Sequence, residues 1–142
     1  MKSYKGTIID LPENGIFVFG SNTQGRHGKG AALVAMQKFG AIYGQSKGLQ
    51  GKSYAVITKD LTKKIHPSIS PEDIISQIRE LYNFARQNLE LDFYIIYSGN
   101  GINLNNYSNE EMASFFASGY ITNNIIFEEE FSKLVFNTHR KL

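Results

Sequence analysis

Short runs of apolar residues alternate along the chain with longer segments of helical periodicity. Residues 16–19 (Ile-Phe-Val-Phe) are apolar at every position and end at Gly20, and residues 54–57 and 93–97 repeat this pattern. A continuous apolar run of this length is typical of a strand buried on both faces of a sheet. We therefore expect three such strands, followed by a fourth over residues 124–127.

Helical spacing follows the first and second of these runs. Residues 30–39 place their apolar side chains on one face, and Gly40 follows as a stop signal. Ser70 and Pro71 provide an N-cap serine with proline at the first helical position, and apolar spacing then continues to Leu89. Both segments are predicted to be helices.

Two more helices are expected in the last third of the chain. Ser108 and Glu111 have the spacing of a capping box, and a last helix is predicted over residues 128–136. The alternation of strand and helix indicates an α/β layered fold. The length of 142 residues suits one domain, because two separate cores would each be too small to bury much surface.

Composition excludes several classes of protein. The chain has no cysteine, which removes disulfide scaffolds, thiolate nucleophiles and thiolate metal sites and suits a reducing cytoplasm. No apolar run approaches the roughly 18 residues of a membrane span, and the first residues lack the apolar stretch of a secretory signal. A formal charge of +2 is too small to imply nucleic-acid binding by itself.

Glycine is concentrated in one part of the chain, since nine of the 13 glycines lie between Gly15 and Gly51. Residues 20–30 form one glycine-rich loop after an apolar strand, and residues 98–103 form a second. Ligands of open α/β sheets bind at the carboxyl ends of the strands. A glycine loop that leads into a helix directs backbone N–H groups toward one point, which suits a phosphate or diphosphate. The alternative is a glycine-rich connection that binds no ligand.

The familiar phosphate and catalytic motifs are missing. Gly28-Lys29 is followed by Gly30 rather than by the hydroxyl residue of a Walker A loop, and no G-x-G-x-x-G pattern follows the first strand. Neither G-x-S-x-G nor H-E-x-x-H is present. The three histidines are far apart in the sequence, so we expect no metal site and no cofactor.

The order of the glycine loops and strands resembles that of macro domains, which bind ADP-ribose. The similarity is greatest to the branch that contains the terminal ADP-ribose glycohydrolases and the antitoxins that reverse DNA ADP-ribosylation. The segments that carry the resemblance are residues 4–8, the loop 25–32 (G-x-x-G-x-G-x-A), the strand 54–59 ending in Ile-Thr-Lys, His66-Pro67 with the helix around Ile74, and the loop 99–103 (Gly-Asn-Gly-Ile-Asn). The resemblance implies a three-layer α/β/α macro-domain-like fold with a mixed central sheet over residues 1–142.

The resemblance also implies particular site residues. Lys59 matches the lysine that attacks the anomeric carbon of the ADP-ribose linkage in that branch, and the alternative is a solvated surface lysine. Asn103 stands where the assisting acid is found, although some antitoxins also lack that acid. Thr7 stands where an aspartate recognises the adenine amino group, and Asp10 is a possible substitute. The ligand contacts implied by the two loops are Asn22, Gly28, Lys29, Gly30, Ala31, Ser98, Gly99, Asn100, Gly101 and Ile102.

Other polar residues have competing interpretations. Asn22 lies either near the distal ribose or in a turn that satisfies its own loop. Arg26 and His27 either border the ribose pocket or are exposed, and His66 is expected to shape the turn before Pro67. Glu128, Glu129 and Glu130 are expected to form a solvated helix start.

Three functions follow from these features. The first is a domain that binds ADP-ribose, free or attached to a protein or nucleic acid, and hydrolyses the linkage through Lys59. The second is a module that binds ADP-ribose or another nucleotide without catalysis. The third is single-stranded nucleic-acid binding, for which the sequence contains no dense basic run. No membrane partner is expected, and the sequence leaves the oligomeric state open.

Overall fold

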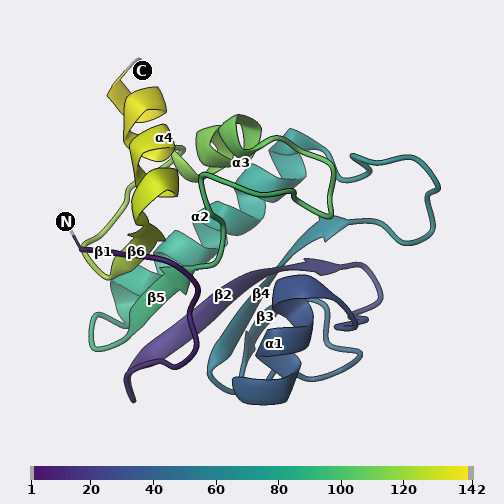
Figure 1. The fold of residues 1–142 in the computed structure, drawn as a ribbon, viewed down its shortest axis with the longest axis horizontal. Helices are drawn as coiled ribbons and strands as arrows, with labels where there is room; N and C mark the ends of the chain where they lie inside the picture. Colours follow the sequence, from purple (N-terminus) through teal and green to yellow (C-terminus); the bar gives the residue numbers. More distant parts are fainter. Residues whose placement is uncertain (1, 141–142) are drawn as a thin grey trace.

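A computed structural model describes residues 2–140 and the side chains of residues 2–138. The described chain forms one six-stranded sheet and four helices (Figure 1). Their bounds, in chain order, are β1 Ser3–Tyr4, β2 Gly15–Asn22, α1 Gly30–Lys38, β3 Gly48–Gln50, β4 Ser53–Lys59, α2 Pro71–Gln87, β5 Asp92–Ile95, α3 Asn109–Phe116, β6 Ile125–Glu128 and α4 Glu129–Arg140.

The sheet is mixed, with the strand order β1-β6-β5-β2-β4-β3. β3 runs antiparallel to β4, and every other pairing is parallel. β2 lies at the centre, between β5 and β4, so the carboxyl ends of these three strands meet at one edge. The loops that follow β2, β4 and β5 therefore gather at this edge.

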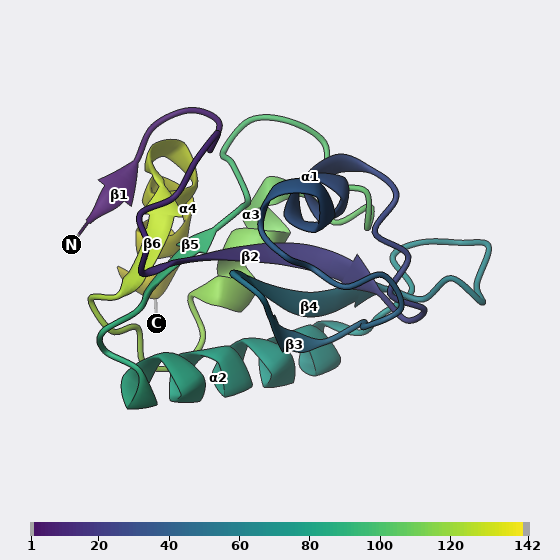
Figure 2. The ribbon, with the colours of Figure 1, turned by 90° about the horizontal axis from the view of Figure 1, so that it is seen from below.

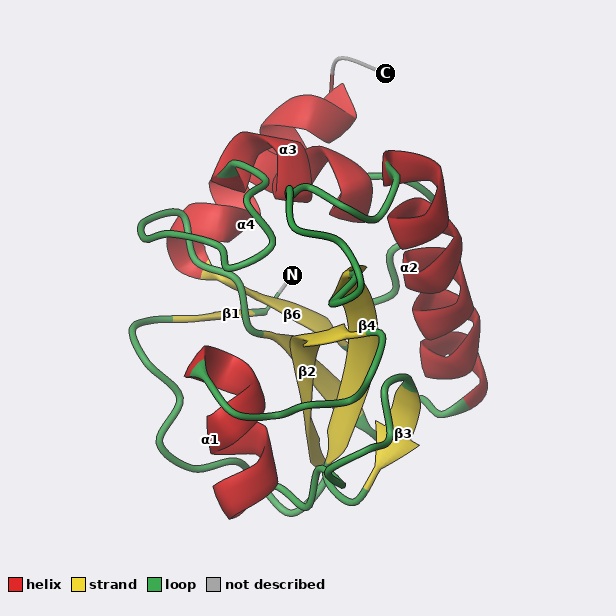
Figure 3. Cartoon of the chain, turned by 90° about the vertical axis from the view of Figure 1, so that its right-hand side faces the viewer, coloured by secondary structure: helices red, strands yellow, loops and turns green. Residues whose placement is uncertain are grey.

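Helices cover both faces of the sheet, which gives three layers (Figures 2 and 3). Alternate residues of β2 face opposite sides, because successive side chains of a strand point in opposite directions. Phe17 and Phe19 pack with α1, whereas Ile16 and Val18 belong to the larger core with α2, α3 and α4. The fully apolar run in the sequence is thus explained by burial on both faces.

The expected α/β class, the helices on both faces and the mixed sheet are confirmed. α1 and α2 begin at the predicted residues, and Ser108 and Glu111 form the predicted capping box of α3. Several boundaries were wrong. β2 continues two residues past Gly20. α2 ends at Gln87 and leaves the Leu89 side chain exposed.

The two edge strands were missed. β1 has two residues and β3 has three, and β3 lies in the glycine-rich part of the chain, where no strand was predicted. Strands this short contain too few alternating positions to produce a periodic signal. The ends of the third and fourth strands also differ from the predictions, since β5 stops at Ile95 and β6 includes Glu128.

No helix among the described residues is long and apolar enough to cross a membrane.

A buried asparagine ties the larger core together. The Asn124 amide donates hydrogen bonds to the carbonyl oxygens of Ala85 (2.9 Å), Asn88 (3.2 Å) and Leu91 (3.1 Å), and its own side-chain oxygen accepts one from Thr122 (2.6 Å). These bonds join the end of α2 and the approach to β5 to the start of β6. Buried carbonyl groups without a donor are costly, so this side chain fixes the connection.

We predict that Asn124→Ala lowers the free energy of unfolding by about 2–3 kcal/mol, because two buried amide N–H donors are removed. The neighbouring Asn123 is exposed, and Asn123→Ala should change stability by less than about 0.5 kcal/mol. Urea denaturation of the two variants and the parent chain measures both values. Equal stability of the two variants would contradict the role given to Asn124.

Candidate functional site: a cleft between α1 and the 98–105 loop

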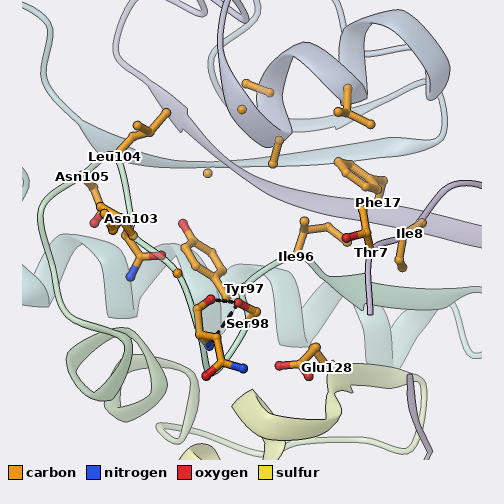
Figure 4. A pocket seen from close by; sticks show the side chains of 18 of the residues that line it. Thr7, Ile8, Phe17, Ile96, Tyr97, Ser98, Asn103, Leu104, Asn105 and Glu128 are labelled. Carbon is orange, nitrogen blue, oxygen red and sulfur yellow. Dashed lines mark hydrogen bonds between the residues drawn. The ribbon is translucent and has the colours of Figure 1, made fainter. Parts of the chain in front are cut away.

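A cleft of about 390 Å³ opens at the edge of the sheet where β2, β4 and β5 end (Figure 4). Its walls come from the segment after β1, from the first turns of α1 and from the loop of residues 98–105. Gly20, Thr58 and Ile96 contribute from the three strand ends. The two glycine-rich segments predicted to hold a ligand thus reach one cavity.

The cleft has an apolar end and a polar end. Figure 4 shows Thr7, Ile8, Phe17 and Ile96 together at one end, with Val34 of α1 completing the apolar lining. The other end is lined by Asn103, Leu104 and Asn105. Lys29 also lines the cleft and precedes Gly30, whose Cβ position would lie 3.3 Å from Cδ1 of Leu104. A ligand with one flat apolar group and one polar, anionic part would match this division.

The N-terminus of α1 is open to the cleft. Lys29 is the N-cap residue and makes no side-chain capping hydrogen bond. Among the described residues, no group accepts a hydrogen bond from the backbone N–H groups of Gly30, Ala31 or Ala32, and these three residues line the cleft. Such groups, together with the positive end of the helix dipole, favour an anion. Gly30 has φ +58°, so a side chain here would be strained.

The loop opposite α1 uses two of its predicted ligand groups internally. The backbone N–H of Gly99 donates to Oε1 of Glu128 at 2.9 Å, and the N–H of Asn100 donates to Oγ of Ser98 at 3.2 Å. A Cβ on Gly99 would lie 2.5 Å from Cβ of Glu130, so Gly99 packs directly on α4. Ser98, Asn100, Gly101 and Ile102 line the cleft, whereas Gly99 does not.

Glu128 is buried at the end of β6, which corrects its expected place in a solvated helix start. Its carboxylate accepts hydrogen bonds from the backbone N–H groups of Gly99, Glu130 (2.9 Å) and Phe131 (3.0 Å). Burial raises the pKa of Glu128, but these three donors outweigh burial and hold the pKa below its ordinary value. An ionised carboxylate therefore caps α4 and anchors the 98–103 loop. Glu129 and Glu130 form surface ion pairs with Lys5 and Lys133.

Tyr97 lies on the floor of the cleft beside β2. A Cβ on Gly20 would come within 2.4 Å of its hydroxyl oxygen, so only glycine leaves room for the phenol against the strand. Burial raises the pKa of Tyr97 to about 12, and a hydrogen bond with Thr58 limits the rise. The phenol is therefore neutral near pH 7 and can take part in hydrogen bonds with a ligand.

Tyr97, Thr58, Glu128, Leu104 and Asn105 were missed as lining residues by the sequence analysis. Tyr97 ends the predicted strand of residues 93–97, and Thr58 and Glu128 directly follow the predicted strands of residues 54–57 and 124–127. The carboxyl ends of strands are thus a signal that could have identified all three. Leu104 and Asn105 gave no such signal, because their positions depend on how the 98–105 loop folds back.

Asn103 lines the polar end with a fixed orientation. Its amide donates to the carbonyl oxygen of Tyr107 (2.9 Å) and to Oδ1 of Asn109 (3.0 Å), so both N–H groups are used and the side-chain oxygen remains an acceptor. Thr7 lines the apolar end with an exposed side chain. Asp10 does not line the cleft, and its carboxylate accepts a hydrogen bond from the N–H of Leu11.

Besides Gly99, three predicted site residues lie outside the cleft lining: Lys59, Asn22 and Gly28. Lys59 is half-buried at the end of β4, where its backbone pairs with Asn22. The Asn22 side chain accepts from the N–H of Arg26 (2.9 Å) and donates to the carbonyl oxygen of Arg26 (2.9 Å). Asn22 therefore satisfies its own loop, as the alternative interpretation stated. Gly28 is exposed.

His27 is fully buried rather than exposed or at the rim of the cleft. Its Nε2 lies 3.1 Å from the carbonyl oxygen of Gln45 and 3.2 Å from Oε1 of Gln50, and its ring packs edge-on against Phe19. Both of these oxygen atoms are acceptors, and Oε1 of Gln50 also accepts from the N–H of Ile42, so Nε2 is the hydrogen-bond donor. His27 thus ties the first glycine loop to the segment before β3, and Arg26 beside it is exposed.

His66 and the remaining charged groups lie outside the cleft lining. Nδ1 of His66 is 2.6 Å from Oγ of Ser68, and the peptide bond to Pro67 is cis. Within the described residues, no group of three His, Cys, Asp or Glu side chains is arranged to hold a metal ion. Lys29 and Glu128 are the only charged residues among those that line the cleft in the described chain.

Comparison with known proteins gives no relative, since no protein-family model, curated protein or solved structure matches the chain.

Gly25 is explained by packing within the protein rather than by a ligand. Its φ is +64°, and a Cβ there would lie 2.5 Å from the backbone carbon of Gly44. We predict that Gly25→Ala lowers the free energy of unfolding by about 2–4 kcal/mol, through both the left-handed backbone and the clash. Gly44 is the matched control, because it also has a positive φ (+96°) but open space around its Cβ position.

Gly44→Ala should cost only about 1–2 kcal/mol, from backbone strain alone. Thermal and urea unfolding of both variants provides the comparison. Equal stability of the Gly25→Ala and Gly44→Ala variants would contradict a close contact between the two loops.

The anchoring role of Glu128 predicts a pH dependence of stability. Because its folded-state pKa is lowered, the carboxylate stabilises the fold above its unfolded pKa of about 4.5, and this contribution is lost as the pH falls from there through the lower folded-state pKa. Glu128→Gln should therefore be clearly less stable than the parent chain at pH 6, and the difference should shrink toward pH 3. Urea unfolding of the two proteins at several pH values measures this difference in stability.

The control is Glu130→Gln, which removes an exposed carboxylate two residues away. It should change the unfolding free energy by less than about 0.5 kcal/mol. A difference between Glu128→Gln and the parent chain that stays constant from pH 6 to pH 3 would contradict the proposed role.

Proposed function

We propose that the chain binds ADP-ribose in the cleft between α1 and the 98–105 loop. The observation that carries this proposal is the open N-terminus of α1, whose first three residues line a cavity with one apolar end and have no hydrogen-bond acceptor for their backbone N–H groups among the described residues. A dinucleotide-like ligand needs donors for its phosphates and a flat apolar surface for its base. The family resemblance of the glycine loops supports the same ligand.

The diphosphate would lie near α1 rather than near Gly99. Glu128 occupies the N–H of Gly99 and places a negative charge on that side of the cleft, which disfavours a phosphate there. Gly30, Ala31 and Ala32 offer N–H groups, and Lys29 adds a positive charge at the rim. Gly101 and Ile102 lie across the cleft and provide a second set of backbone groups.

The base would occupy the apolar end. Ile8, Phe17, Val34 and Ile96 form apolar walls, and the Thr7 hydroxyl is the polar group nearest to them in Figure 4. The terminal ribose would then reach Asn103, whose side-chain oxygen is free to accept a hydrogen bond from a sugar hydroxyl. This arrangement uses both ends of the cleft.

Binding without catalysis is the function that the geometry supports better. Lys59 lies outside the cleft lining, and Asn103 is an amide that cannot transfer protons as a carboxylate does. Hydrolysis through Lys59, which the resemblance implies, stays a prediction. It requires that the parent chain release ADP-ribose from a modified protein or DNA and that Lys59→Ala abolish this release.

Ala31→Glu tests the ligand site separately from the fold. A carboxylate in the first turn of α1 interacts favourably with the helix dipole, and this offsets the cost of a larger side chain at half-buried Ala31, so thermal stability should change little. The same carboxylate points its charge at the proposed diphosphate position and should weaken ADP-ribose binding at least tenfold. Isothermal titration calorimetry and thermal unfolding measure the two effects.

The matched control is Gln37→Glu, which adds the same charge to an exposed position in the last turn of α1. Its affinity for ADP-ribose should stay within about twofold of the parent chain. Absence of binding by the parent chain at millimolar ADP-ribose, or equal binding by Ala31→Glu, would overturn the proposed site.

A further inference from the structure

The chain contains two Asn-Gly pairs, and isoleucine follows both of them. They are Asn14-Gly15 and Asn100-Gly101. Asparagine before glycine is prone to spontaneous deamidation, because glycine has no side chain to keep its backbone nitrogen away from the asparagine amide. Since the two pairs share the same sequence on their carboxyl side, the folded structure decides how differently they react.

Deamidation begins when the backbone nitrogen of the glycine attacks Cγ of the preceding asparagine. A bond forms between these two atoms, the bond from Cγ to the side-chain nitrogen breaks, and that nitrogen leaves as ammonia with the proton of the glycine N–H. The product is a cyclic succinimide, and water then opens it to aspartate or to isoaspartate, in which the main chain runs through Cγ. The reaction therefore needs a free glycine N–H, a free asparagine amide and access for water.

The fold protects the first pair. Gly15 is buried, and its backbone N–H donates to the carbonyl oxygen of Pro12 at 2.8 Å. The Asn14 side chain donates to the carbonyl oxygen of Glu90 at 3.1 Å. A Cβ on Gly15 would lie only 3.0 Å from Cβ of Leu11, so little space remains for a ring to form. The first pair thus lacks all three requirements of the reaction.

The second pair meets them. Asn100 and Gly101 are both exposed, and no described residue accepts a hydrogen bond from the N–H of Gly101 or bonds the side-chain amide of Asn100. The Ser98 hydroxyl donates to the carbonyl oxygen of Asn100. This bond draws electron density from the peptide between Asn100 and Gly101, so the proton of the attacking N–H is easier to remove.

Deamidation of Asn100 would change the cleft, because Asn100 is one of its lining residues. The product carries a carboxylate next to Gly99, whose N–H is bonded to the carboxylate of Glu128. A second negative charge on this wall of the cleft disfavours an anion. Isoaspartate also lengthens the main chain by one carbon atom, which displaces the backbone groups of Gly101 and Ile102.

We propose that Asn100 is a site of spontaneous deamidation in the folded protein and that the reaction lowers the affinity of the cleft for anionic ligands. The fold directs the reaction to this asparagine, since it shields Asn14. The part about the ligand rests on the proposed function, whereas the selective reaction at Asn100 does not.

The first test is incubation of the folded protein at pH 8, with mass spectrometry of its proteolytic peptides at intervals. Electron-transfer fragmentation distinguishes asparagine, aspartate and isoaspartate at each position. Asn100 should react at least about tenfold faster than Asn14, which corresponds to a barrier lower by about 1.4 kcal/mol. The rate at Asn100 should fall at pH 6, because the attacking N–H must lose its proton.

Unfolding in guanidinium chloride provides the control for this selectivity. Asn14 and Asn100 should then react at similar rates, because only the shared Asn-Gly-Ile sequence remains. Similar rates in the folded protein, a faster reaction at Asn14, or no reaction at Asn100 while the unfolded chain reacts would overturn the site.

The second test follows ADP-ribose affinity by calorimetry during the same incubation. The affinity of the parent chain should decline as Asn100 is converted. Asn100→Gln should keep its initial affinity throughout, because glutamine needs a larger ring that forms far more slowly. Asn100→Asp should bind ADP-ribose about fivefold or more weakly than the fresh parent chain.

The matched control is Asn14→Asp, which adds the same charge at an exposed position outside the cleft lining. Its affinity should stay within about twofold of the parent chain. Fully converted protein that binds as tightly as fresh protein would overturn the effect on the cleft. If the fresh parent chain does not bind ADP-ribose while Asn100 still reacts selectively, the proposed function is wrong and the modification site stands.

Discussion

The parallel pairing of β2 with both β4 and β5 decides which loops meet at the edge of the sheet. These strands end side by side, so the glycine loop after β2, the lysine-bearing segment after β4 and the 98–105 loop after β5 are brought together. The cleft floor depends on Gly20 of β2, because a side chain there would displace the Tyr97 phenol. Loss of this pairing would separate the residues that line the cleft.

Negative charge inside the cleft wall limits where an anion can bind. Glu128 fills the N–H groups at the start of α4 and the N–H of Gly99, so this helix terminus is satisfied within the protein. α2 and α3 are capped by Ser70 and Ser108. α1 has no side-chain cap and begins at the cleft. The start of α1 thus offers N–H groups to a ligand, whereas the start of α4 carries the negative charge of Glu128. This difference directs the anionic part of a ligand toward α1.

Much of the fold followed from local signals in the sequence. Ser70-Pro71 and the pair Ser108 and Glu111 carry their capping chemistry in the sequence itself, and the starts of α2 and α3 were predicted from it. The glycine loops were predicted to meet, and Gly30 and Gly101 do line one cleft. The burial of His27 and Glu128 could not be predicted, because both depend on partners 18 to 29 residues away.

The central claim is that an anionic ligand binds at the open terminus of α1, and backbone amide resonances measure this most directly. Titration of the isotopically labelled protein with ADP-ribose, followed by two-dimensional amide NMR, should shift the signals of Gly30, Ala31, Gly101 and Ile102 most strongly. The signals of Gly25 and Gly99 should move little, because Gly25 packs against Gly44 and the N–H of Gly99 is bonded to Glu128. Shifts centred on Asn22 and Lys59 with none in the first turn of α1, or no shifts at all, would contradict the account.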